Sequence, residues 1–162
     1  MSTAQHNLSD YDATALPDGS GMRIGIVVAD WNDTYTYAMA EGALRVLQAQ
    51  GVRPDDIEVA HVPGSFELIY GATRMVDSAR FDAVIAIGCV IRGETPHFDY
   101  ICQGTTEGLS RLNLRGTTPV IYGLLTCNNS EQAEARCGGV LGNKGDECAI
   151  TALQMVAYRR TL

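Results

Sequence analysis

A nearly continuous apolar run at residues 81–90 constrains the fold of this chain more than any other feature. A strand with one face in water alternates apolar and polar residues, and this run does not alternate. It therefore predicts a strand that is buried on both faces, as in a parallel sheet covered by helices. Gly88 and Gly93 mark the point where the run stops and a polar turn begins.

The same unit, a buried strand followed by a helix, is repeated along the chain. The predicted strands are residues 22–29, 57–62, 81–90 and 119–126. The predicted helices are residues 34–50, 63–79, 97–114, 130–137 and 144–160. Strands that alternate with helices through short connections favour right-handed crossovers and a parallel sheet.

The fold class that follows is α/β, a flavodoxin-like doubly wound parallel sheet in three α/β/α layers. With 162 residues, one domain accounts for the whole chain. Residues 1–21 are polar and lack periodicity, so we expect an N-terminal arm there and the folded domain at residues 22–162.

Charge and composition exclude several classes of protein. The net charge is −7 and no Lys/Arg cluster is present, which argues against binding to nucleic acid or to an anionic membrane surface. No apolar run approaches the ~20 residues of a membrane span, and no targeting segment is recognisable, so we expect a soluble, cytoplasmic protein. Five scattered cysteines without C-x-x-C spacing predict reduced thiols and no metal site.

Four polar segments follow the ends of the predicted strands. They are Trp31, residues 63–67, residues 92–97 and residues 126–129. The carboxyl ends of parallel strands meet at one edge of a sheet, which is where open α/β sheets bind ligands. A functional site is therefore predicted at this edge.

The segment after the third strand carries the most chemistry. It brings together the Thr95 hydroxyl, the free N–H groups of residues 93–95 and the His97 imidazole, which titrates near neutral pH. The alternative is a capping loop with a surface histidine, and this segment alone favours neither.

Two other segments have a functional and a structural interpretation. Ser65, Phe66 and Glu67 begin a helix whose free N–H groups favour negative charge on a ligand, although Phe66 is also a plausible core residue. Trp31, the only tryptophan, offers a flat ring for stacking on a heteroaromatic ligand, or a plain hydrophobic anchor.

Two cations lie near the end of the chain. Arg136 follows a helix start with Asn129 as a plausible N-cap, and its guanidinium suits a phosphate. The alternative for Arg136 is a surface i, i+4 partner of Gln132. Lys144 stands between glycines, but the spacing is not that of a P-loop.

Taken together and in this order, these segments resemble the 6,7-dimethyl-8-ribityllumazine synthase family. The resemblance covers about residues 22–160 and rests on residues 61–67, 88–100, 119–126 with 131–133 and Arg136, and 142–145. It implies the condensation of 5-amino-6-(D-ribitylamino)uracil with 3,4-dihydroxy-2-butanone 4-phosphate in riboflavin biosynthesis. The products are the lumazine, phosphate and water, and no cofactor is needed.

The resemblance also implies a role for each matching residue. On the pyrimidine side the implied residues are Trp31, Tyr122, Ser65, Phe66 and Glu67, with mainly backbone groups of Cys89, Val90 and Ile91. On the phosphate side they are Glu94, Thr95 and Arg136, with Lys144 in a supporting role. His97 is the implied catalytic residue and would transfer protons.

Departures from the commonest family pattern have implications of their own. Trp31 stands where Phe is more usual, and in this family a Trp there is associated with riboflavin binding. Ile69 replaces a frequent Pro and Cys137 a common Ala. The family forms pentamers, sometimes sixty-subunit shells, in which Phe66 and Arg136 would come from different subunits.

Two rival functions use the same residues. A non-catalytic flavin carrier would need the edge of the sheet and Trp31, but not His97 or Arg136. A cysteine hydrolase would pair Cys102 or Cys127 with His97, although neither thiol stands on a recognisable nucleophile elbow.

Overall fold

The computed structural model of the chain describes residues 7–162 and contains one parallel four-stranded sheet. Its strands are β1 (Ile24–Ala29), β2 (Ile57–Val62), β3 (Ala83–Ile91) and β4 (Val120–Cys127). They lie in the order β2-β1-β3-β4, with every neighbouring pair parallel. This order confirms the predicted flavodoxin-like, doubly wound sheet.

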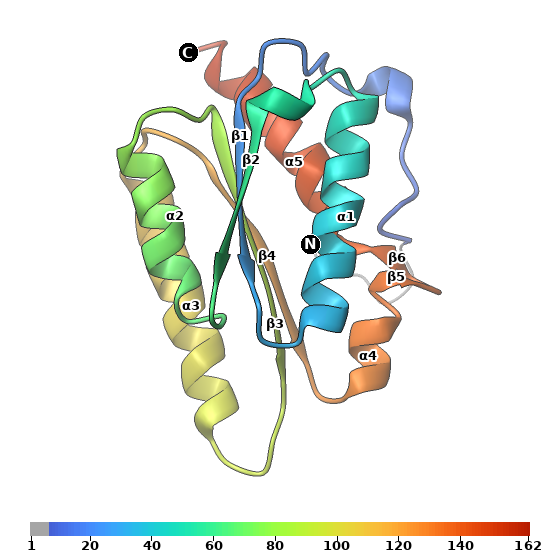
Figure 1. Cartoon of the computed structure of the whole chain (residues 1–162), viewed down its shortest axis with the longest axis vertical. Helices are drawn as coiled ribbons and strands as arrows, with labels where there is room; N and C mark the ends of the chain where they lie inside the picture. The colour runs from blue at the N-terminus through green and yellow to red at the C-terminus, as the bar shows by residue number, and fades with distance from the viewer. Residues whose placement is uncertain (1–6) are drawn as a thin grey trace.

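Helices cover both faces of the sheet (Figure 1). On one face lie α1 (Asp33–Ala49) and α5 (Lys144–Arg159), and on the other α2 (Leu68–Asp77) and α3 (His97–Leu114). The core is accordingly divided into two apolar clusters, one on each side of the sheet. The three α/β/α layers predicted from the sequence are therefore confirmed.

Burial on both faces explains why the strand sequences do not alternate. In β1, Ile26 and Val28 pack in the cluster with α1 and α5, whereas Val27 and Ala29 pack in the cluster with α2. All six residues of β1 are buried, as are the first seven of β3. Only the edge strand β2 is largely open to solvent.

The second predicted helix begins later than expected. The sequence predicted a helix from the Pro63-Gly64 turn to about residue 79, but α2 starts at Leu68 and ends at Asp77. Glu67 N donates to Gly64 O at 3.2 Å and Leu68 N to Ser65 O at 3.4 Å, so tight three-residue turns precede the helix. At the other end, Ala79 adopts a left-handed conformation with φ 53°, which ends the helix.

The predicted helix at residues 130–137 is also too long. Helix α4 covers Ser130–Glu134, and an antiparallel hairpin of β5 (Cys137–Gly139) and β6 (Gly142–Asn143) follows. Gly138 and Gly142 have φ of 102° and 79°, which side chains rarely tolerate, so these two glycines permit the hairpin. The sequence analysis predicted no strand in this segment.

The described part of the predicted arm packs along α1 and the β5–β6 hairpin. This part of the arm contains a 3-10 turn, η1 (Ala13–Ala15). Elsewhere in the chain, a second 3-10 turn, η2 (Pro54–Asp56), precedes β2. Leu8 N donates to Leu141 O at 2.8 Å, and Gly19 N donates to Gln50 O at 2.7 Å. Among residues 7–162, no helix is long and apolar enough to cross a membrane.

We predict that Gly145→Ala destabilises the fold. Alanine is the better helix former, which alone favours the variant, but a Cβ at Gly145 would overlap the backbone of Met39 in α1. Overpacking of this kind costs about 1–3 kcal/mol. Denaturant unfolding should show a lower midpoint than for the matched variant Gly93→Ala, whose Cβ would meet open space. Equal midpoints would contradict the close packing of α1 against α5.

Candidate active site

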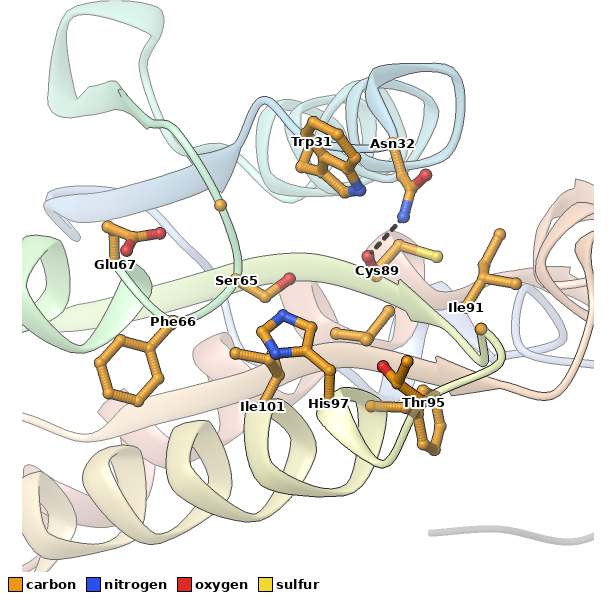
Figure 2. Close-up of a pocket in the computed structure, with 14 residues that line it drawn as sticks. Trp31, Asn32, Ser65, Phe66, Glu67, Cys89, Ile91, Thr95, His97 and Ile101 are labelled. Atoms are coloured by element: carbon orange, nitrogen blue, oxygen red, sulfur yellow. Dashed lines mark hydrogen bonds between the residues drawn. The ribbon is translucent and has the colours of Figure 1, made fainter.

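A pocket of about 530 Å³ opens at the carboxyl ends of β1, β2 and β3, beside the start of α3 (Figure 2). Most residues that the sequence predicted for the site line this pocket. They are Trp31, Ser65, Phe66, Glu67, Cys89, Val90, Ile91, Thr95 and His97. The remaining lining residues are Asn32, Gly64, Gly93, Phe98 and Ile101. Three loops, the end of β3 and one helix therefore contribute to one concave surface.

Trp31 lies on the loop between β1 and α1. Its side chain is 73% exposed, so within this chain it is not a hydrophobic anchor. Its backbone is fixed, because Trp31 N donates to Pro63 O at 3.0 Å. An exposed indole on a fixed backbone is suited to stacking on a flat ligand.

Asn32 is a lining residue that the sequence analysis missed. It adopts the left-handed conformation, with φ 64°, and its Nδ2 donates to Cys89 O at 2.9 Å. Asn is among the few residues that tolerate this conformation. Asn32 could have been found from its position directly after Trp31, because a side-chain amide there can join the ends of two strands.

The turn before α2 presents Phe66 to solvent. The Phe66 side chain is 50% exposed, so the interpretation of Phe66 as a core residue was wrong for this chain. Ser65 beside it is buried, and Ser65 O accepts from Thr105 Oγ1 of α3 at 3.3 Å. A Cβ at Gly88 would come within 2.8 Å of Ser65 Oγ, so Gly88 permits this close approach.

The end of β3 offers backbone rather than side-chain groups at Cys89. The Cys89 side chain is buried in the core cluster with α1, while its carbonyl accepts from Asn32. Val90 and Ile91 are half-buried and line the pocket. The backbone role that the resemblance implies for these three residues stays a prediction.

His97 is the first residue of α3, and Figure 2 shows its imidazole pointing into the pocket toward the turn that carries Ser65. Its loop is held by Arg92, whose guanidinium forms an ion pair with Asp99 at 2.9 Å and donates to Asn128 Oδ1 at 3.2 Å. The guanidinium also lies 4.1 Å from the centre of the Phe98 ring. A titratable group is thus presented to the pocket on a restrained loop.

The remaining predicted residues do not line this pocket. Glu94 is an exposed residue of the same loop as Thr95. Arg136 follows α4 and donates to Gln132 O at 3.0 Å, and Lys144 pairs with Glu147 at 2.8 Å. Tyr122 shares a hydrogen bond of 2.7 Å with Thr106 and lines a separate hollow. The pocket and the two cations therefore lie apart within one chain.

The start of α4 is capped as the sequence predicted. Asn129 Oδ1 accepts from Gln132 N at 3.0 Å, and Gln132 Oε1 accepts from Asn128 N at 2.9 Å. These bonds satisfy free N–H groups of the helix start. Arg136 is an i, i+4 partner of Gln132, as the alternative interpretation proposed, but its guanidinium donates to the backbone carbonyl of Gln132 and not to the side chain.

The thiols do not form a nucleophilic site in the described chain. A hydrogen bond with Cys89 lowers the pKa of Cys127 to about 7, but the Cys127 side chain is only 3% exposed. Burial raises the pKa of Cys102. Neither thiol lines the pocket with His97, and no group of ligands for a metal ion is found within residues 7–162.

Comparison with known proteins identifies the family. The model of the 6,7-dimethyl-8-ribityllumazine synthase family matches residues 21–160. The chain is 56% identical to the 6,7-dimethyl-8-ribityllumazine synthase of Phocaeicola vulgatus, covering 100% of this chain and 96% of the relative. It is 53% identical to that of Parabacteroides distasonis, over 98% of this chain and 99% of the relative.

A third relative agrees. The 6,7-dimethyl-8-ribityllumazine synthase of Porphyromonas gingivalis is 54% identical, and the match covers 99% of both chains. The sequence segments on which the resemblance rests lie within the region that the family model matches. Most of the predicted site residues line one pocket. The chain therefore belongs to the 6,7-dimethyl-8-ribityllumazine synthase family.

Proposed function

We propose that this chain is the transferase of riboflavin biosynthesis that condenses 5-amino-6-(D-ribitylamino)uracil with 3,4-dihydroxy-2-butanone 4-phosphate. The observation that carries the proposal is the convergence of Trp31 and His97 on one pocket at the carboxyl edge of the sheet. The family supplies the reaction, and the pocket supplies a stacking surface and a proton carrier for it. A flavin carrier is not favoured, because it would have no use for His97.

The pyrimidine substrate binds against the loops of β1, β2 and β3. Trp31 stacks on the ring, and residues 65–67 contact the ring and the ribityl chain. Backbone groups of residues 89–91 bond to the polar edge of the pyrimidine, because the Cys89 side chain is turned into the core. Tyr122 remains a prediction for this part of the site.

The butanone phosphate binds at the loop between β3 and α3. Gly93 and Thr95 line the pocket, and the exposed Glu94 lies between them in the sequence. A phosphate in a chain of net charge −7 needs a local cation, and Arg136 is the predicted one. Since Arg136 does not line the pocket of its own chain, it reaches the phosphate of a neighbouring subunit in a homopentamer.

The role of His97 follows from the steps of the reaction. Attack of the amine on the ketone and loss of water give an imine, elimination expels inorganic phosphate, and ring closure expels a second water. Each step moves protons between substrate atoms that are held close together, so proximity supplies much of the rate. His97 accepts and returns these protons, and Arg136 stabilises the departing phosphate.

We predict that Arg136→Ala lowers kcat/KM for the butanone phosphate about 10–100-fold, since a charge-assisted bond to phosphate is lost. Lumazine fluorescence measures the rate against the uncatalysed background. Arg53→Ala removes an exposed guanidinium that pairs with Asp55 at 3.5 Å and should keep wild-type activity. Full activity of Arg136→Ala would refute the phosphate site, and a wild-type rate equal to background would refute the reaction.

We predict that His97→Ala lowers kcat about 10²-fold and leaves measurable activity, because general acid–base catalysis is one contribution and proximity another. Single-turnover mixing of both substrates separates the rate of chemistry from binding. His97→Gln, which keeps a polar side chain without proton transfer near neutral pH, should be equally slow. A folded variant that binds both substrates and has no activity at all would contradict this partition.

We predict that the protein binds riboflavin through Trp31, whose exposed ring suits the flavin as well as the pyrimidine. Titration followed by flavin fluorescence should show quenching in the wild-type protein. Affinity should fall about tenfold in Trp31→Ala and less in Trp31→Phe, in the order of ring area. Equal affinity of all three proteins would show that riboflavin does not use this ring.

A further inference from the structure

A cluster of three side chains joins the two loops that carry Trp31 and Phe66. His61 Nδ1 donates to Asp30 Oδ1 at 2.7 Å, and the Tyr37 hydroxyl donates to the same oxygen at 2.9 Å. The His61 and Tyr37 rings meet edge to face, with centroids 5.3 Å apart. The three residues come from the end of β1, from β2 and from α1.

The position of this cluster makes it relevant to the pocket. Asp30 directly precedes Trp31, and His61 stands two residues before Pro63 and the turn at residues 64–67. The parallel ladder of β1 and β2 continues into these loops, since Asp30 N donates to Val62 O at 2.8 Å and Trp31 N donates to Pro63 O at 3.0 Å. The cluster therefore lies where both loops leave the sheet.

Trp31 needs such a restraint because packing does not supply one. Its ring is mostly exposed, so few side-chain contacts fix it. On one side its backbone is held by Asn32, which bonds to Cys89. On the other side the restraint is Asp30, whose pKa is lowered by the hydrogen bonds from His61 and Tyr37, so that it accepts both bonds as a carboxylate.

We propose that Asp30, His61 and Tyr37 are positioning residues that hold Trp31 and the turn at residues 64–67 in register for the pyrimidine substrate. The identity of the substrate in this assignment rests on the proposed function. The restraint on Trp31 is independent of the proposed function. None of the three residues lines the pocket. The cluster acts through the two loops, so its loss should weaken pyrimidine binding and leave the proton transfers by His97 nearly unchanged.

The test compares Asp30→Ala and His61→Ala with a matched control. Glu58→Gln removes an ion pair of the same kind, Glu58 with Arg80 at 2.6 Å, from the opposite end of β2. Both pairs are about half exposed, which makes the control a fair one. His61→Asn keeps an N–H near the position of Nδ1 and serves as the conservative variant.

The first readout is the fluorescence anisotropy of Trp31, the only tryptophan, in the protein without substrates. We expect a fall in Asp30→Ala and His61→Ala, none in Glu58→Gln, and substantial recovery in His61→Asn. Unchanged anisotropy in both alanine variants would overturn the proposal. Because no substrate is present, this readout stands even if the proposed reaction is wrong.

The second readout is steady-state kinetics. KM for the pyrimidine should rise about three- to fivefold, the upper part of the range expected for an exposed ion pair, with kcat within about twofold of wild type. The double variant Asp30→Ala/His61→Ala should be no worse than Asp30→Ala alone, because Asp30→Ala already removes the contact with His61. An unchanged KM with lowered anisotropy would overturn the positioning role, and a fall in kcat alone would do so too.

Discussion

The apolar side chains on both faces of β1 and β3 exclude solvent from the centre of the sheet, and the rest of the molecule follows from that burial. Buried strands must satisfy their N–H and C=O groups within the ladder, so polar loops occur only where the strands end. Parallel strands place those ends along one edge. The pocket therefore combines residues from distant parts of the sequence without any feature dedicated to bringing them together.

At this edge the loops are held by polar contacts rather than by packing. Asn32 joins the end of β1 to the Cys89 carbonyl, and Arg92 joins the loop before α3 to Asp99 and Asn128. Exposed aromatic rings need such restraints, since apolar burial does not position them. Asn32 and Arg92 thus hold the loops that present Trp31 and His97 to the pocket.

The sequence predicted the sheet and its order well, because burial on both faces leaves a strong signal in a run such as residues 81–90. It failed where local backbone geometry decides. The late start of α2 depends on tight turns at residues 64–67, and the β5–β6 hairpin depends on glycines with positive φ, neither of which follows from hydrophobic periodicity.

The candidate site was predicted unevenly for a similar reason. Trp31, Ser65 and His97 were found from their positions at strand ends, and all three line the pocket. Asn32 was missed because its role depends on a left-handed backbone and on a carbonyl 57 residues away. The exposure of Phe66 contradicts the general expectation that an aromatic residue packs inside.

We propose that a complete site needs the pocket of one subunit and Arg136 of the next. Two variants with little activity, His97→Ala and Arg136→Ala, can be unfolded together and reassembled into mixed oligomers. If neighbouring subunits share each site, an intact His97 from one variant can meet an intact Arg136 from the other. In a random mixture about a quarter of the sites contain both groups, and activity should rise to about a quarter of the wild-type activity. Activity no higher than the mean of the two separate variants would show that each chain builds its site alone.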